Sequence, residues 1–101
     1  MADIIYHVTT KQEWNAALQN GFYEAPSLAA EGFIHCSKAE QVAGVLKRYF
    51  KAQTNLVKLV IDVNKLTSKL QYDFSPSVNE KFPQVYGTIN VDAVIDIVEL
   101  N

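Results

Sequence analysis

Two histidines, His7 and His35, are the side chains in this sequence best suited to proton transfer near neutral pH. Each lies in a short run of alternating apolar residues, so we expect each at or near the end of a β-strand. If those strands lie close together, the two imidazoles flank one cleft, where they can bond ribose hydroxyls or phosphate oxygens or move a proton. The alternative is that each ring satisfies a buried polar position in a noncatalytic binding or interaction module.

Hydroxyl and carboxylate side chains extend this candidate site. The hydroxyls that could act as donors and acceptors beside the histidines are those of Thr9, Tyr23, Ser37 and Tyr86. Ser37 has a competing role as the cap of the next helix. Asp73 and Glu80 are the candidate carboxylates, with solvated strand-edge or loop positions as the alternative for both. Phe33, Tyr23 and Tyr86 carry rings that could stack on a base, with core packing as the alternative.

The single cysteine, Cys36, limits the chemistry that the chain can support. It excludes an internal disulfide and any multi-cysteine zinc motif. Strand alternation turns Cys36 away from His35, and no further histidine or cysteine completes a set of four ligands. We therefore expect no metal site and an inert, core-facing thiol.

Composition predicts a globular protein of one domain, residues 1–101. The sequence is 49% hydrophobic and 20% charged, with a net charge of −2, so we expect no nonspecific binding to a nucleic-acid backbone. No secretory signal or run of about 18 apolar residues is present, which predicts a cytoplasmic protein without a membrane partner.

The first half of the chain predicts alternating strands and helices. Residues 4–8 alternate as a strand, and the Thr10-x-x-Glu13 capping box predicts a helix over residues 11–20. Ser27 is expected to cap one helical turn that Gly32 ends. Residues 33–36 then form a second strand, which brings His35 to a strand-to-helix junction.

The second half predicts one further helix and mostly strands. The Ser37-x-x-Glu40 spacing is that of a capping box. The residues that follow predict a helix, because apolar side chains recur at the helical spacing i, i+3, i+4, i+7, i+8: Val42, Val45, Leu46, Tyr49 and Phe50. Strands are expected at 56–63, 69–74 and 93–100, with an extended piece at 84–89 and a mobile surface loop at 75–83 that could act as a lid. This order favours an α+β fold with a small split or mixed sheet and two main helices.

Several segments together resemble the small bacterial proteins grouped as domain of unknown function 952. They are IYHVT at 5–9, APSLAAEGFIHCS at 25–37, Gln41, and FPQVYG at 82–87, and the resemblance covers nearly the whole chain. That family is similar in fold to ADP-ribosyltransferases and RNA 2′-phosphotransferases, which hold NAD or ADP-ribose in a cleft between two small sheets. The resemblance therefore implies an ADP-ribosyltransferase-like fold with such a cleft.

The resemblance also implies roles for particular residues. His7 takes the place of a first-strand residue that binds ribose or carboxamide, and His35 with Ser37 takes that of a second-sheet residue. Asp73 stands where relatives often carry glutamate, and Gln84 where they often carry histidine. Because Gln84 cannot titrate and Asp73 is one methylene shorter, either change could leave a pocket that binds without catalysing transfer.

Two functions follow as hypotheses. The first is an ADP-ribosyltransferase-like protein that binds NAD, ADP-ribose or a related nucleotide, with NAD as a candidate substrate rather than a resident cofactor. Its expected catalytic residues are His7, His35 and Asp73, and its expected ligand-binding residues are Thr9, Tyr23, Ser27, Ser37, Gln84 and Tyr86. The second is the noncatalytic module with structural histidines. Both remain open at this stage, as do the acceptor and the oligomeric state.

Overall fold

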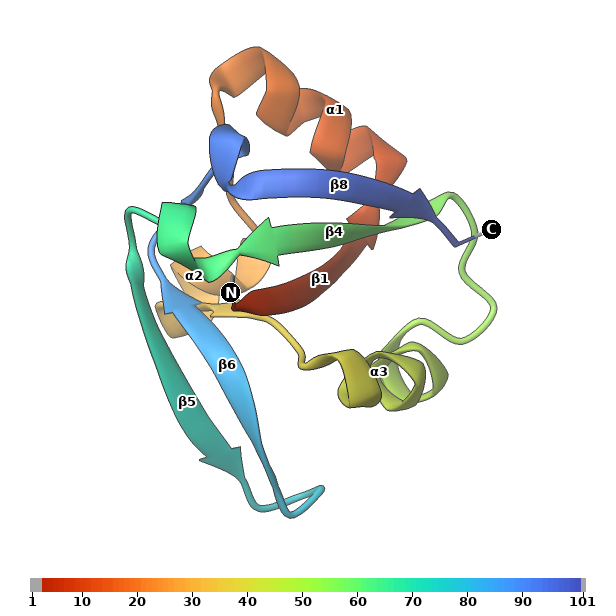
Figure 1. The fold of residues 1–101 in the computed structure, drawn as a ribbon. Helices are drawn as coiled ribbons and strands as arrows, with labels where there is room; N and C mark the ends of the chain where they lie inside the picture. The colour runs from red at the N-terminus through yellow and green to blue at the C-terminus, as the bar shows by residue number, and fades with distance from the viewer. Residues whose placement is uncertain (1–2, 101) are drawn as a thin grey trace.

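The central sheet consists of three antiparallel strands in the computed structural model, which describes residues 3–100. They are β1 (Ile4–Thr10), β4 (Leu56–Asp62) and β8 (Val94–Glu99), in the order β1-β4-β8 (Figure 1). Val57, Leu59 and Ile61 alternate along β4 and are buried, as expected for a strand between two neighbours. The prediction of a central strand near residues 56–63 is confirmed.

A second sheet carries His35. Its strands are β3 (Ile34–His35), β6 (Glu80–Tyr86) and β5 (Lys69–Ser75), in the order β3-β6-β5. Two backbone hydrogen bonds between Tyr6 and Ser37, of 2.8 and 2.7 Å, join β1 to the chain that leaves β3. This link brings the strand of His7 beside the strand of His35. A third pair, β2 (Phe22–Tyr23) with β7 (Ile89–Asn90), completes the strands.

The α+β class is confirmed, and the split form of the sheet is the one observed. Every strand pair within residues 3–100 is antiparallel, so the alternative of a mixed sheet is wrong. The physical reason is that β5 and β6 form a hairpin, while β4 returns beside β1 in the opposite direction.

Three α-helices complete the fold of residues 3–100. Helix α1 (Lys11–Asn20) has the predicted bounds: the Thr10 hydroxyl accepts from the Glu13 backbone N–H at 3.1 Å, and Gly21 ends the helix. Helix α2 (Pro26–Glu31) is short, and α3 (Val42–Tyr49) follows a 3₁₀ turn, η1 (Ala39–Gln41). Two further 3₁₀ turns are η2 (Val63–Lys65) and η3 (Val91–Ala93). No helix in residues 3–100 is long and apolar enough to cross a membrane.

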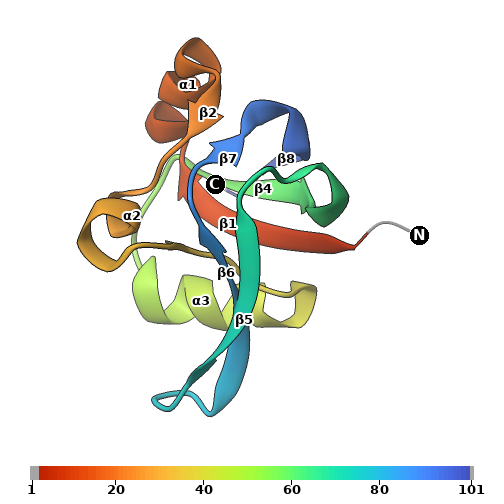
Figure 2. The same cartoon turned by 90° about the vertical axis from the view of Figure 1, so that its left-hand side faces the viewer.

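Two apolar clusters lie on opposite faces of β1. Ile5 belongs to the larger cluster, with Trp14 of α1 and the buried face of β4. Val8 belongs to the smaller cluster, with Val42 of α3 and Leu56. Figures 1 and 2 show α1 and α3 on opposite sides of β1, with the tip of the β5–β6 hairpin on the side of α3.

Three local predictions are wrong. Residues 75–83 do not form a long loop, because Asn79 adopts a left-handed conformation (φ 56°) and closes a short turn before β6. Ser27 does not cap α2; the helix begins at Pro26, whose fixed φ suits the first helical position. Ser37 does not cap the next helix, because its backbone N–H and C=O pair with Tyr6. At the start of that helix the Gln41 side chain accepts a hydrogen bond from the Lys38 N–H.

Candidate functional site

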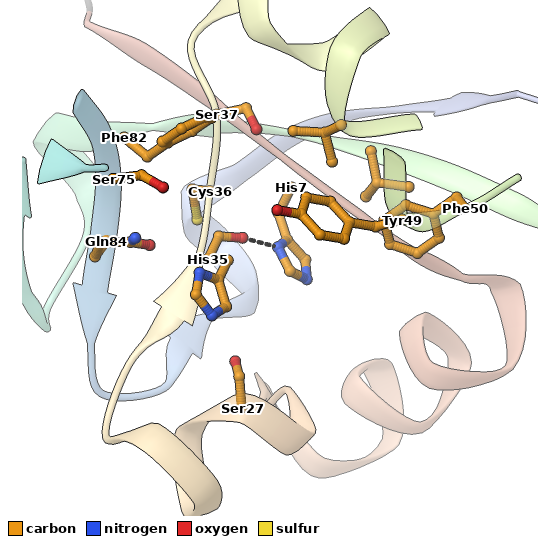
Figure 3. A pocket seen from close by; sticks show the side chains of 12 residues that line it. His7, Ser27, His35, Cys36, Ser37, Tyr49, Phe50, Ser75, Phe82 and Gln84 are labelled. Carbon is orange, nitrogen blue, oxygen red and sulfur yellow. Dashed lines mark hydrogen bonds between the residues drawn. The ribbon is translucent and has the colours of Figure 1, made fainter. Parts of the chain in front are cut away.

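A cavity of about 370 Å³ lies where β1, β3, β6, α2 and α3 meet (Figure 3). This volume is within the range of small-molecule sites. The lining residues are His7, Val8, Ser27, His35, Cys36, Ser37, Val45, Tyr49, Phe50, Ser75, Phe82 and Gln84. The structure therefore brings together five of the predicted site residues: His7, Ser27, His35, Ser37 and Gln84. None of the lining residues is a lysine or an arginine.

His7 is buried, and both of its ring nitrogens have partners. Nδ1 lies 2.5 Å from the His35 carbonyl oxygen, and Nε2 lies 2.8 Å from the Tyr23 hydroxyl. Because a carbonyl oxygen only accepts, Nδ1 carries the proton, and in the neutral ring the Tyr23 hydroxyl donates to Nε2. The Thr9 hydroxyl, 3.0 Å from that of Tyr23, completes the chain of hydrogen bonds.

The electrostatics agree with a neutral His7. Burial lowers the pKa of His7 from 6.5 to about 4, against the opposing effect of its hydrogen bond to the His35 carbonyl. Burial also raises the pKa of the Tyr23 hydroxyl well above its ordinary value. Thr9 and Tyr23 do not line the cavity; they lie behind His7 and hold its ring. His7 is thus placed to orient β3 and to shape the cavity wall.

The His35 side chain is half exposed and is held by two neighbours. Its Nε2 lies 2.9 Å from a carboxylate oxygen of Glu31, the last residue of α2. Phe33 packs edge-on against the imidazole, with ring centroids 4.8 Å apart. Within residues 3–100 no hydrogen bond is made to Nδ1, so one nitrogen of His35 is free to contact a ligand.

Gln84 has a buried polar atom without a protein partner among residues 3–100. Its side chain is 6% exposed, and the amide oxygen is buried without a hydrogen-bond partner in the described part of the chain. Leaving a buried polar atom unpaired costs about 1–3 kcal/mol, so native proteins seldom do so without a functional reason. Figure 3 shows the Gln84 side chain pointing from β6 toward His35 at the edge of the cavity.

Two other lining residues, Ser27 and Cys36, differ in their roles. The Ser27 hydroxyl donates to the Phe33 carbonyl at 2.8 Å and so fixes the turn between α2 and β3. Cys36 is buried, and burial raises its pKa well above the ordinary value, so its thiol stays protonated. Within residues 3–100, no group of three histidine, cysteine, aspartate or glutamate side chains is arranged to hold a metal ion.

Asp73 and Tyr86 are not among the residues that line the cavity. The Tyr86 hydroxyl donates to the Asp73 carboxylate, which also accepts from the Gln71 amide at 2.6 Å. These hydrogen bonds lower the pKa of Asp73 and raise that of Tyr86. Strand register puts Asp73 opposite Phe82, on the sheet face that also carries Gln84. The pair thus occupies the same face as the site, outside its cavity.

Several site residues were missed by the sequence reasoning. Glu31 was seen only as the end of a helical turn, and Ser75 and Phe82 were assigned to a loop. The α3 residues Val45, Tyr49 and Phe50 were predicted as a helical stripe. That periodic stripe was the available signal, but periodicity alone does not distinguish a core contact from a cavity wall.

Comparisons with known proteins give one family match and several similar solved structures. The family model described as protein of unknown function (DUF952) matches residues 8–97. The crystal structure of protein CC0527 from Caulobacter crescentus is 31% identical, with a TM-score of 0.89, over 98% of this chain and 87% of that one. The solution NMR structure of CC0527 gives 31% identity and a TM-score of 0.82, over 97% and 84%. Curated proteins give no match.

The matches in sequence and in structure both extend over most of the chain. The cavity residues from His35 to Gln84 lie within the matched range. The chain therefore belongs to the DUF952 family.

Proposed function

We propose that the protein binds a nucleotide-type small molecule, with NAD and ADP-ribose as the first candidates, and that an uncharged ring of the ligand occupies the cavity. The observation that carries this proposal is the buried amide oxygen of Gln84, which has no partner within residues 3–100, beside an open cavity of about 370 Å³. A ligand that hydrogen bonds with this amide would remove the cost of leaving it unpaired.

The charge of the lining favours a ring over a phosphate inside the cavity. Phosphate groups are commonly held by arginine, by lysine or by the N-terminus of a helix. Neither cationic residue lines this cavity, whereas Val45, Tyr49 and Phe50 offer it an apolar wall. In this proposal the phosphates of a nucleotide remain outside, in solvent.

Transfer of ADP-ribose is a further step that the proposal does not require. Such a reaction needs a site that stabilises positive charge developing at the ribose C1′. Of the three expected catalytic residues, only His35 presents a free nitrogen beside the cavity; His7 is fully bonded, and Asp73 is bonded to Tyr86 outside it. Binding is therefore proposed first, and release of nicotinamide is an assay for the second step. A cytoplasmic location remains part of this proposal.

The noncatalytic interaction module remains the second candidate. The observation that favours it is the closed hydrogen-bond chain of His7, Tyr23 and Thr9, which leaves no ring nitrogen of His7 for a ligand.

A backbone-amide NMR titration tests the proposal. NAD, ADP-ribose and AMP are added in turn, and signals of residues 6–9, 33–38 and 84–87 are followed. We expect saturable shifts in all three segments with at least one nucleotide. Gln84→Leu should weaken that binding about tenfold or more while the free energy of unfolding stays equal or rises, because the unpaired amide is removed.

Gln71→Leu is the matched control. Gln71 faces Gln84 across the β5–β6 register, but it is exposed and outside the cavity, so its loss should leave affinity unchanged. If no nucleotide shifts these signals, the nucleotide proposal fails and the interaction module is favoured.

A further inference from the structure

We infer that Glu31 is a positioning residue that holds the His35 ring in one tautomer and so makes the cavity selective for a planar ligand group that donates N–H hydrogen bonds. This inference rests on the proposed function, because it names the chemical group that the proposed cavity accepts. The group is a primary carboxamide or an exocyclic amine on a flat ring.

The first step is the state of the His35 ring. The Glu31 carboxylate can only accept, so the nitrogen 2.9 Å from it, Nε2, carries a proton. In the neutral ring Nδ1 is then an acceptor, and no residue within 3–100 donates to it. The carboxylate thus decides which kind of hydrogen bond His35 offers to a ligand.

The second step is the position of His35 beside Gln84. The two residues are directly opposite in the β3–β6 register, which places both side chains on one face, with Cβ atoms about 4.5–5.5 Å apart. Figure 3 shows the Gln84 amide pointing from β6 toward β3, beside the His35 ring, which itself extends toward α2. The Gln84 amide oxygen is a second acceptor without a donor among residues 3–100; because it is buried, a ligand reaches it when the amide turns toward the cavity.

The third step is the ligand chemistry that two adjacent acceptors select. An –NH₂ group carries two donor hydrogens and can satisfy both Nδ1 of His35 and the oxygen of Gln84. A carboxylate at the same place would meet two acceptors without a cation to balance it. Across the cavity, Tyr49 and Phe50 supply aromatic surface against which a flat ring can pack.

Two matched pairs of small probes test this selectivity. Nicotinamide differs from nicotinate in carrying an amide, and adenine differs from hypoxanthine in carrying an amine. We expect the amide and the amine to bind about tenfold more tightly than their partners, measured by NMR titration of the intact protein. Equal affinities within the pairs would overturn the inference. A preference for nicotinate and hypoxanthine would also overturn it, because it would mean that Gln84 presents its –NH₂ group to the ligand and not its oxygen.

The role of Glu31 has a readout that needs no ligand. Long-range ¹H–¹⁵N spectra of the neutral His35 ring at alkaline pH should show the Nε2–H tautomer in the parent protein. In Glu31→Gln the new amide can donate or accept, so we expect a mixture of tautomers and a fall of about threefold or more in the preference for nicotinamide over nicotinate.

Glu24→Gln is the control, because it removes the same charge from an exposed glutamate outside the cavity and should change neither readout. A parent tautomer other than Nε2–H, or one that Glu31→Gln leaves unchanged, overturns the positioning role. If none of the four probes binds while nucleotides still do, the selectivity fails and the proposed function stands; if neither probes nor nucleotides bind, both fail.

Discussion

At the scale of single residues, His7 and His35 are the same side chain in opposite surroundings. His7 is enclosed, with both nitrogens bonded to protein groups, while His35 is half exposed and bonded through only one nitrogen. Because both nitrogens of His7 are bonded to β3 and to Tyr23, its imidazole can only shape the cavity wall. His35 has one free nitrogen, which can contact a ligand. The two histidines that the sequence presents as equivalent therefore have different tasks.

The buried state of His7 predicts a loss of stability in mild acid. Its pKa falls from 6.5 in the unfolded chain to about 4 in the folded protein. Between these two pH values the unfolded chain binds a proton that the folded protein does not. The contribution of His7 to the free energy of unfolding is therefore complete above pH 6.5 and is lost as the pH falls toward 4, a decrease of about 3 kcal/mol. Urea unfolding across this window should show the decrease.

The His7 ring signals should titrate with a midpoint near pH 4 in the same protein, followed by NMR. His7→Asn should flatten the dependence of unfolding on pH. The carboxyl groups of Asp73 and Glu99, whose pKa values hydrogen bonds lower, add their own loss of stability at the acid end of this window and below it. A His7 midpoint near 6.5 would contradict the prediction.

At the scale of elements, the short unit from α2 to β3 places the residues that we assign to ligand contact. Gly32 ends α2 in the left-handed conformation (φ 88°), and its N–H bonds to the Leu28 carbonyl. Ser27 holds the far side of the turn at the Phe33 carbonyl. This tight turn is what lets Glu31 reach His35, four residues later.

Two glycine substitutions should change stability in opposite directions. Gly32→Ala meets no atom within 4 Å, so its cost is backbone strain alone, about 1 kcal/mol. Gly44→Ala lies inside α3, and the atoms nearest to its added methyl group are at the flexible end of Arg48, so helix propensity should stabilise the protein by about 0.5–1 kcal/mol. Urea unfolding of both variants tests this, and equal effects would speak against the strained turn.

At the scale of the whole molecule, the cavity exists because two sheets and a helix meet without filling the space between them. The link between Tyr6 and Ser37 fixes β1 against β3, while α3 packs on the other face of β1 through Val42. Tyr49, at the end of α3, is 62% exposed although it lines the cavity. No single element carries the site.

Filling the cavity should therefore block binding without unfolding the protein. Val45→Phe adds a ring to the α3 wall, where about 370 Å³ of space is open, so the free energy of unfolding should change by less than about 1 kcal/mol. Nucleotide affinity should fall about tenfold or more in the NMR titration. Val98→Phe, the same change on exposed β8, should leave affinity intact; unchanged binding by Val45→Phe would place the ligand elsewhere.

Much of the fold follows from local patterns. The Thr10 cap and Gly21 set α1, and the alternation of 56–63 and 69–74 sets β4 and β5 within one or two residues. The same reasoning fails at 75–83, because two prolines and several polar residues suggest a loop. In the structure, the Pro83 carbonyl accepts from the Cys36 N–H at 3.0 Å, so β6 continues through a residue that lacks a donor.

The sequence by itself determined that His35 and Ser37 share one face of their strand and that Cys36 faces the core, because alternation is a local property of extended backbone. It also identified His7 and His35 as candidates. Only the tertiary structure decided the partners of these side chains. In it, the His7 ring is hydrogen bonded to Tyr23, and Glu31 is hydrogen bonded to His35. The Gln84 amide oxygen has no partner within residues 3–100, and Asp73 accepts a hydrogen bond from Tyr86. These outcomes depend on contacts between residues far apart in the chain and on burial, which strand pairing and packing create and no local pattern encodes.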